Sequence, residues 1–282
     1  MTKPTANTAI IIVAFNSERC LPKAMHAIAT QTVAPRQVII VDAGSHDTRY
    51  LDKYCSPTTA IVKPGSALGF CQANNIGYQH VASDCDYILL LNPDAFLSET
   101  FLERAVAHFE DPSYWECGAL TGMALGYDLD NDIPTGTYDS TGVFHTWYGR
   151  WYDRGQGESI AEGRYSAPEA IPAITGALFF IRKEALDSIL YPGRNLFDPS
   201  FFMYKEDIDL SLRLRNHRWT LYYFPDLVAH HCRGWDTDRS AMSRSARVSS
   251  ARNELWIHRR ERKVVPTLYS LAKYAAVKWF DQ

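Results

Sequence analysis

Short runs of apolar and β-branched residues alternate with amphipathic stretches over the first 125 residues, and this alternation limits the folds open to the chain. We predict strands at residues 9–15, 37–42, 59–63 and 87–92, with helices at residues 18–31 and 69–80 between them. The pattern is typical of βαβ units built around a mainly parallel sheet. The 282-residue chain is 46% apolar and 22% charged, so a large core can form and a disordered chain is excluded.

Polar or small residues stand where three of these predicted strands end. Ala14 and Asn16 close the first strand, Asp42 ends the second, and Asn92 and Asp94 follow the fourth. Ligands of open α/β sheets bind beyond the carboxyl ends of the strands, so we expect these residues to converge on one crevice. The carboxylate of Asp42 can accept a hydrogen bond from a nucleotide base, and the alternative is that it caps its own turn.

A glycine-rich stretch at residues 65–70 is similar to a phosphate-binding loop. It contains neither GxGxxG nor GxxxxGK[ST], which argues against a dinucleotide-dependent dehydrogenase and a P-loop nucleotidase. Gly69 and Asn74 are therefore candidates for binding another ligand near the start of the following helix. The alternative is that these residues bind no ligand and form an ordinary helix start, with polar residues one turn into the helix.

The segment Asn92-Pro93-Asp94 follows a buried apolar strand and carries two oxygen-bearing side chains. Oxygen ligands at this place suit a hard divalent cation that bridges a diphosphate. The alternative is a simple Asn-Pro turn, because proline must end the strand pairing. His231 ends a later apolar strand and is either a metal ligand or a surface histidine.

Three carboxylates, Glu206, Asp207 and Asp209, crowd the start of a predicted helix. The helix dipole favours acidic residues there, but it accounts for one or two of them rather than three. A carboxylate at a helix start that faces a cleft is well placed to act as a general base. We therefore predict a catalytic role for Asp207 and Glu206.

The pattern changes at residues 126–172, a stretch rich in Gly, Asp and aromatic residues, which indicates an insertion of loops and short strands. Its aromatic residues Trp147 and Trp151 can stack on a sugar or form a small separate core. After the insertion we predict strands at 173–182, 220–224 and 227–231 and helices at 183–190 and from residue 206.

The chain has a net charge of −3, but residues 233–282 contain 11 basic and 5 acidic residues. This basic tail on an acidic body indicates anionic lipid or nucleic acid as a partner, or simply a solvated helical face. We expect no nucleic-acid binding, because no recognised nucleic-acid-reading motif is present. Residues 264–280 follow a basic cluster and mix apolar residues with two lysines, so they can lie on a membrane surface or pack on the domain or a second subunit.

The apolar runs are far shorter than the ~20 residues that span a bilayer, and no signal-peptide core precedes the first of them. The six cysteines are scattered, which indicates neither a disulfide framework nor a zinc site. We expect a cytoplasmic protein that can lie on the inner face of the cell membrane, and a homo-oligomer stays open.

Six motifs in this order resemble glycosyltransferase family 2, and its rhamnosyltransferase-like members most of all. They are Val13-Ala14-Phe15-Asn16, Val41-Asp42, the segment from Gly69 to Gly77, Asn92-Pro93-Asp94, Glu206-Asp207 and His231. The resemblance runs from about residue 8 to about residue 235. It implies a GT-A fold, an inverting reaction, a nucleoside-diphosphate sugar donor and a divalent metal, Mg²⁺ or Mn²⁺.

The resemblance also implies roles for individual residues. Asp42 would bind the nucleotide base, Asn16 would lie near the ribose or diphosphate, and Asp207 of the Glu-Asp motif would be the general base. Asn92-Pro93-Asp94 takes the place of the family's DxD motif but carries Asn at its first position, so Asp94 and His231 would hold the metal. Thr175 and Gly176 would lie near the donor sugar or the acceptor.

These inferences together predict a GT-A catalytic domain at residues 1–232 and a basic helical extension at residues 233–282. The expected fold is α/β, with a Rossmann-like, mainly parallel sheet and flanking helices. The expected reaction moves a sugar from a nucleotide donor, dTDP-L-rhamnose, to a surface-glycan or lipid-linked acceptor. The alternatives are a UDP-hexose or UDP-galactofuranose donor, or a non-catalytic carbohydrate-binding protein on the same fold.

Overall fold

The structure is a computed structural model that describes residues 3–233 and 243–279. Within these residues the main sheet contains β1 (Thr5–Ala14), β2 (Ala34–Asp42), β3 (Thr59–Val62), β4 (Tyr87–Leu91), β5 (Ala95–Leu97), β6 (Cys117–Asp128), β7 (Ile133–Ser140), β10 (Glu169–Ala170), β11 (Leu178–Arg182) and β12 (Thr220–His231). A second, two-stranded sheet pairs β8 (Val143–His145) with β9 (Trp151–Asp153).

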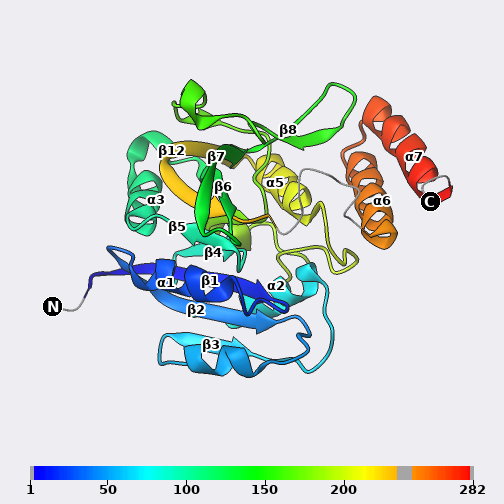
Figure 1. Ribbon diagram of the computed structural model, residues 1–282. Coiled ribbons are helices and arrows are strands. Elements are labelled where there is room, and N and C mark those ends of the chain that lie inside the picture. The colour runs from blue at the N-terminus through cyan, green and yellow to red at the C-terminus, as the bar shows by residue number, and fades with distance from the viewer. Residues whose placement is uncertain (1–2, 234–242, 280–282) are drawn as a thin grey trace.

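The helices of the described residues flank this sheet. They are α1 (Leu21–Ala29), α2 (Phe70–Gln79), α3 (Phe101–Glu110), α4 (Lys183–Asp187), α5 (Glu206–Asn216), α6 (Arg244–Arg260) and α7 (Val264–Trp279), with the 3₁₀ turns η1 (Arg49–Tyr54), η2 (Pro112–Tyr114) and η3 (Ile160–Glu162). Figure 1 shows the sheet running through the body of the molecule and α6 and α7 side by side at one end.

The strand order in the sheet is β10-β12-β6-β11-β4-β1-β2-β3. The strands β3, β2, β1 and β4 are parallel, as the alternating pattern predicts, and β11 is antiparallel to β4 and to β6. The register places Ala14 opposite Asp42 and Ile12 opposite Leu91, so the carboxyl ends of β1, β2 and β4 meet at one edge.

Two hydrophobic cores cover the two faces of the sheet. Alternate residues of β1 point to opposite faces, so Ile11 belongs to the core that includes α2, α4 and α5, and Ile10 belongs to the core that includes α1 and α3. The five residues of β4 are all buried, which is the expected pattern for a strand covered on both faces. The central strands are therefore held rigidly, and their ends are fixed in place.

Three elements differ from the sequence prediction for identifiable reasons. Residues 220–231 form the single strand β12, whose register with β6 shifts between Phe224 and Val228, where Pro225 cannot donate a backbone hydrogen bond. The strand predicted to begin at residue 173 begins at Leu178, because residues 173–177 approach β8 and α5. The insertion contributes β7 as an eight-residue strand of the main sheet rather than only loops and short strands.

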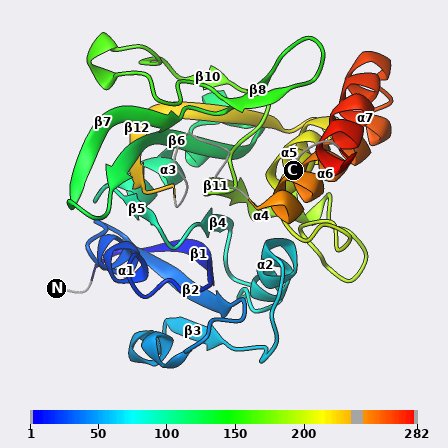
Figure 2. The ribbon, with the colours of Figure 1, turned by 45° about the vertical axis from the view of Figure 1, so that its right-hand side comes forward.

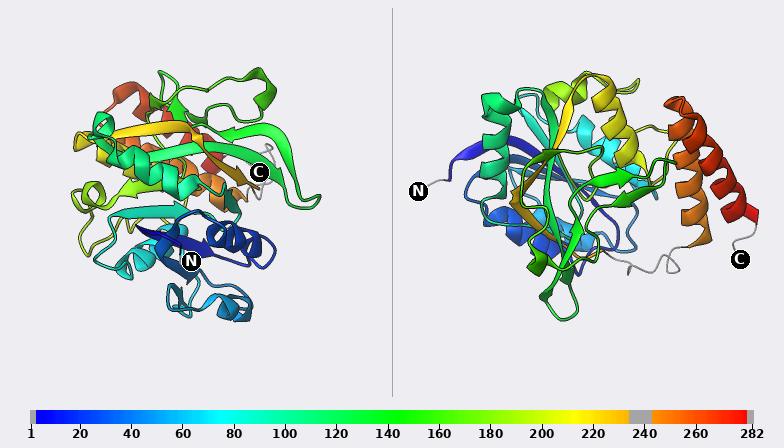
Figure 3. Two further views of the ribbon diagram at one scale, coloured as in Figure 1. Left: turned by 90° about the vertical axis from the view of Figure 1, so that its left-hand side faces the viewer. Right: turned by 90° about the horizontal axis from the view of Figure 1, so that it is seen from above.

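The helices α6 and α7 lie next to α5, and α7 is the outer helix of the pair (Figures 2 and 3). Helix α6 joins the main domain through buried side chains such as Ile257, which belongs to the same core as α5. The part of the predicted tail at residues 234–242 and 280–282 lies outside the described residues. Among the described helices, none combines the length and apolar character needed to cross a bilayer.

Replacing Gly77 with alanine should destabilise the fold. A Cβ atom at Gly77 would lie 2.6 Å from Cγ2 of the buried Ile11, whose branched side chain cannot turn away. Overpacking lowers the free energy of unfolding by about 1–3 kcal/mol, and the higher helix propensity of alanine raises it by at most about 1 kcal/mol. We expect urea titration to show a net loss of about 1 kcal/mol in the free energy of unfolding. The matched control is Gln72→Ala on the exposed side of α2, and equal stability of Gly77→Ala and wild type would contradict this packing.

Candidate active site

The ends of β1 and β2 are joined by hydrogen bonds between their turns. Asn16 has a φ of +48°, donates its backbone N–H to Ser45 Oγ at 2.9 Å, and accepts the His46 backbone N–H on its Oδ1 at 2.9 Å. Ala14 accepts a backbone hydrogen bond from Ala43 at 2.8 Å. The structure thus places Ala14 and Asn16 at the edge that the sequence predicts, as parts of a cross-linked turn.

Asp42 lies at the same edge and is only 3% exposed. Its two carboxylate oxygens accept the backbone N–H groups of Gly44 and Ser45, each at 3.1 Å. Asp42 therefore does cap its own turn, which is one of the two roles left open by the sequence. Its contact with a nucleotide base stays a prediction.

Helix α2 supports the site through its packing. A Cβ atom at Gly69 would lie 2.3 Å from the Phe202 carbonyl oxygen, so the glycine allows the loop before α5 to approach closely. Asn74 is buried and donates to the Phe70 carbonyl at 2.9 Å within its own helix. The adjacent Asn75 exchanges two hydrogen bonds with the Phe197 backbone, at 3.0 and 2.8 Å. These residues fasten the loop at residues 197–205 to α2.

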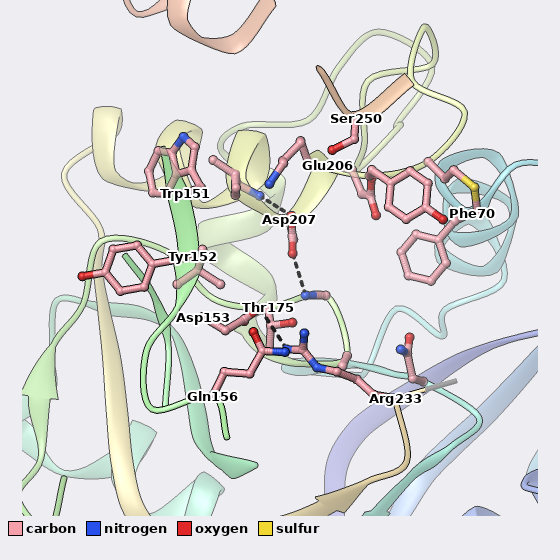
Figure 4. A pocket seen from close by; sticks show the side chains of 18 of the residues that line it. Phe70, Trp151, Tyr152, Asp153, Gln156, Thr175, Glu206, Asp207, Arg233 and Ser250 are labelled. Carbon is pink, nitrogen blue, oxygen red and sulfur yellow. Dashed lines mark hydrogen bonds and ion pairs between the residues drawn. The ribbon is translucent and has the colours of Figure 1, made fainter. Parts of the chain in front are cut away.

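A cleft of about 400 Å³ opens between the carboxyl edge of the sheet, the start of α5 and the helices α6 and α7. Of the residues that the sequence singles out, it is lined by Asn92, Trp151, Thr175, Gly176, Glu206, Asp207 and His231. Figure 4 shows Glu206, Asp207, Thr175 and Trp151 around it, with Arg233 on the far side.

The two tryptophans of the insertion have different positions. Trp151 is 3% exposed, lines the cleft and donates its indole N–H to Nε2 of His258 on α6 at 3.2 Å. Trp147 is 82% exposed and does not line the cleft, because it follows β8 in the turn that leads back to β9. Trp151 thus packs in the core and also lines the cleft, whereas Trp147 does neither, and stacking of either tryptophan on a sugar stays a prediction.

The adjacent carboxylates Glu206 and Asp207 begin α5 at the wall of the cleft. Asp207 accepts the Gly176 backbone N–H on Oδ2 at 3.0 Å and the Ile208 backbone N–H on Oδ1 at 2.8 Å (Figure 4). Burial raises the pKa of Asp207, although Lys205 and the two N–H donors act in the opposite direction. Burial, and next the charge of Asp207, raises the pKa of Glu206 to about 8. Asp207 is therefore the member of the pair that holds the negative charge.

A strained turn delivers these two residues to the cleft. Tyr204 and Lys205 both have left-handed backbone conformations, with φ of +73° and +70°. Successive non-glycine residues in this region are unfavourable, and such strain persists only where the surroundings impose it. The buried Asn253 of α6 supplies that support, since its Nδ2 donates to the carbonyls of Met203 at 3.1 Å and Tyr204 at 2.9 Å.

A buried charge network lies across the cleft from Asp207. The pairing of β12 with β5 sets His231 opposite Ala95, and this brings its Nε2 to 3.3 Å from Asp94 Oδ1. On its other side His231 Nδ1 lies 2.9 Å from Asp139 Oδ2 on β7. Arg233 also donates to Asp139, and its Nη2 lies 2.8 Å from Asp153 Oδ2.

The electrostatics of this network keep His231 positively charged at neutral pH. Burial by itself would lower the pKa of His231, but the carboxylates of Asp94 and Asp139 outweigh it and raise that pKa to about 10. Burial likewise opposes ionisation of Asp94, and His231 in turn holds the pKa of Asp94 below its usual value. The network therefore holds two cations, His231 and Arg233, at the cleft, and the three carboxylates that pair with them leave it with no net positive charge.

Three side chains beside this network carry atoms of the kind that ligate divalent cations. Asp94 offers a carboxylate, Asn92 an amide whose nitrogen lies 3.4 Å from His231 Nε2, and His231 an imidazole once it loses its proton. Mixed oxygen and nitrogen ligands of this kind suit Mn²⁺ or Mg²⁺ when a ligand supplies further oxygens. Within residues 3–233 and 243–279, no group of three or more His, Cys, Asp and Glu residues gathers as a complete metal site.

Asp139, Asp153, Arg233 and Asn253 are site residues that sequence reasoning misses. Asp139 and Asp153 lie in the insertion, where no periodicity marks them, and Asp139 meets His231 from 92 positions away. The only available signal is Arg233, which follows His231 by two residues at the end of an apolar strand. Asn253 lies in a basic stretch that gives no sign of contact with the active site.

Comparison with known proteins gives a consistent result. The sequence model of a family described as Glycosyl transferase family 2 matches residues 9–190. An N-acetylglucosaminyl-diphospho-decaprenol L-rhamnosyltransferase of Mycobacterium tuberculosis is 22% identical over 84% of this chain and 80% of its own. Rhamnosyltransferase WbbL of Escherichia coli is 27% identical over 65% of this chain and 67% of its own.

Solved structures support the fold. The crystal structure of GalNAc-T7 with UDP, GalNAc and Mn²⁺ superposes with a TM-score of 0.67 and 17% identity over 89% of this chain. The chain spans about half the length of that protein, 48%. The likeness confirms the predicted GT-A fold, with its mostly parallel central sheet and flanking helices.

Replacing Glu206 with glutamine should change how stability depends on pH. In the folded protein Glu206 keeps its proton up to about pH 8, whereas in the unfolded chain it loses the proton in the ordinary glutamate range. The folded state therefore binds more protons between these values, and wild-type stability falls as pH rises through this window. Because glutamine does not ionise, the variant should not lose stability in this pH window.

Urea titrations at about pH 5 and about pH 8 show whether the stability of wild type falls between these two pH values. We expect Glu206→Gln to gain stability relative to wild type at the higher pH. A stability difference that is the same at both pH values would contradict the raised pKa of Glu206.

Replacing Asn253 with alanine should loosen the turn before α5. Two partly buried carbonyls lose their donor, which costs about 1 kcal/mol of folding free energy. We also expect faster amide hydrogen exchange at residues 203–208, measured by mass spectrometry. The control Asn216→Ala removes an exposed bond to Glu261 and should leave both quantities unchanged. Unaltered exchange in Asn253→Ala would show that α6 does not hold this turn.

Proposed function

Because the chain belongs to glycosyl transferase family 2, we propose that it is an inverting transferase which moves a sugar from a nucleoside diphosphate to an acceptor hydroxyl. The observation that supports this reaction best is the opposition of charges in the cleft. Asp207 lies in the wall of the cleft as a half-buried carboxylate, and the cations His231 and Arg233 line the same cleft. An inverting transfer needs a base on the acceptor side and positive charge on the leaving-group side.

The step follows from this arrangement. The acceptor oxygen attacks the anomeric carbon of the donor, the bond from that carbon to the diphosphate oxygen breaks, and Asp207 receives the hydroxyl proton. Gly176 and Ile208 hold the Asp207 carboxylate in one orientation, so its receiving oxygen has a defined position. His231 and Arg233 stabilise the negative charge of the departing diphosphate. A divalent cation held by Asp94, and by His231 once its imidazole has lost the proton, would supply this charge stabilisation in place of the His231 cation.

The donor that we propose is dTDP-L-rhamnose, and the acceptor is a surface glycan or a lipid-linked glycan. This choice rests on the two relatives, both of which are rhamnosyltransferases by name, one of them acting on a diphospho-decaprenol. Asp42, Asn16 and Asn92 would bind the nucleotide at the carboxyl edge of the sheet, and Thr175 and Gly176 would adjoin the sugar. In this proposal residues 1–232 form the catalytic domain, and the extension closes one side of its cleft.

Replacing Asp207 with asparagine should abolish most sugar transfer without weakening the binding of the nucleotide-sugar donor. Removal of a general base lowers the rate by about 10²- to 10⁴-fold, while the contacts to the nucleotide are unchanged. Initial rates and donor titration calorimetry measure the two effects separately. Glu184→Gln is the matched control, since Glu184 is an acid in the first turn of α4 and lies on the exposed surface. Turnover above half the wild-type value in Asp207→Asn would remove Asp207 from the mechanism.

Two further substitutions separate the metal contact from the base contact. Asp94→Ala should weaken nucleotide-sugar binding chiefly when Mg²⁺ or Mn²⁺ is present, because Asp94 would hold the cation on the diphosphate. Asp42→Ala should weaken binding equally with and without metal. Calorimetry with dTDP-L-rhamnose, UDP-hexoses and UDP-galactofuranose, each with metal or chelator, tests both roles and the donor choice. An identical response of the two variants to chelator would contradict this separation.

A further inference from the structure

Helix α7 has an unusual distribution of exposed residues. Eight of its nine exposed residues are apolar, and the ninth is Lys278. The large ones are Val264, Val265, Leu268, Leu271 and Trp279, which are 47–72% exposed. At 100° per residue all nine fall within an arc of roughly 160° on one side of the helix. A helix on the surface of a water-soluble domain normally shows the opposite pattern.

The polar residues of α7 face inward instead. Ser270 is fully buried, and its hydroxyl lies 2.6 Å from Nδ1 of His258 on α6. Lys273 pairs with the buried Glu254 of α6 at 2.6 Å. A hydrogen bond and an ion pair thus attach α7 to α6, and the apolar side chains are left exposed. Figure 3 shows α7 on the outer side of α6.

Basic residues flank this apolar face. Arg259 and Arg262 are exposed at the turn that precedes α7, and Lys278 is exposed at its other end. An apolar face with basic flanks and a terminal tryptophan is the composition of helices that lie in the interface of a membrane with anionic lipids. Helix α7 is too short and too polar on its inner side to cross a bilayer, so an interfacial position is the one that fits.

We propose that α7 lies in the surface of an anionic membrane with its apolar face among the lipids, and that this places the catalytic cleft over a membrane-anchored acceptor. The charges favour lipid over a second copy of this chain as the partner. Antiparallel pairing of two α7 helices would set Arg259 and Arg262 beside Lys278 of the other copy, and these like charges repel. Anionic lipid headgroups complement the same residues.

The same helices connect the membrane face to the active site. On the side opposite its apolar face, α7 contributes Lys273 and Val277 to the cleft, and α6 contributes Arg247 and Ser250. An acceptor whose diphosphate joins a lipid to a sugar would meet these cationic side chains between the membrane and Asp207. This part of the inference rests on the proposed function, whereas the membrane contact of α7 does not.

Sedimentation of the full chain with vesicles tests the contact. We expect wild type to bind vesicles of phosphatidylglycerol mixed with phosphatidylcholine, and to bind phosphatidylcholine alone more weakly. The double substitution Leu268→Glu with Leu271→Glu should lower binding about 10- to 100-fold. Arg259→Gln with Arg262→Gln should lower it roughly 25-fold, about fivefold per charge, on the anionic vesicles only.

The matched control is Trp115→Glu, which removes a 75% exposed aromatic residue that follows η2. It should bind vesicles like wild type, and all variants should keep the wild-type melting temperature and donor affinity. Equal vesicle binding by wild type and the leucine variant would overturn the proposal. So would a wild-type dimer that becomes a monomer in the leucine variant without any vesicle binding, since the face would then join two copies.

A comparison of two acceptors, one soluble and one held in vesicles, tests this proposal separately from the proposed function. With donor binding intact, the leucine variant should transfer sugar to a soluble acceptor analogue at the wild-type rate and to a vesicle-borne lipid-linked acceptor far more slowly. Equal rates on the vesicle-borne acceptor would overturn the link between α7 and the cleft. Vesicle binding without any nucleotide-sugar binding would instead refute the proposed function and leave the membrane contact standing.

Discussion

Two adjacent carboxyl groups at the start of α5, the buried Glu206 and the half-buried Asp207, are the constraint around which the cleft is arranged. Burial disfavours ionisation, so Glu206 keeps its proton to about pH 8, whereas each oxygen of Asp207 accepts the backbone N–H of another residue. The fold supplies that support from distant segments. The loop before β11 provides the Gly176 N–H, and α6 provides Asn253, which holds the strained turn ahead of the pair. One basic oxygen is thus fixed where an acceptor can reach it.

The second constraint is that the same cleft must stabilise the negative charge of the leaving diphosphate. His231 lies between Asp94 and Asp139, which keep it protonated, and Arg233 extends the network to Asp153. The cations are therefore held in place before any ligand binds, which is the preorganisation that electrostatic catalysis requires. Helix α6 connects the two sides, because it contacts the turn before Glu206 and, through His258, the indole of Trp151.

Features encoded locally could be predicted from the sequence, and features formed by distant partners could not. The apolar runs predicted β1, β2, β3 and β4 and their shared carboxyl edge, because each strand carries its own pattern. The excess of acid at residues 206–209 likewise predicted a cleft-facing helix start. Asp139 and Asn253 could not be predicted, because their partners lie 92 and about 50 positions away and no periodicity marks either residue. The outward apolar face of α7 needed coordinates, since composition alone cannot tell which side of a helix is covered.

The central claim is that Asp207 activates the acceptor for a single displacement at the anomeric carbon. The most direct test is the anomeric configuration of the sugar in the product, read by proton and carbon NMR and compared with that of the donor. A single displacement with Asp207 as base predicts that every product linkage has the inverted configuration from the first turnover onward. A product that retains the donor's configuration would require a second displacement on the protein, and would contradict the account.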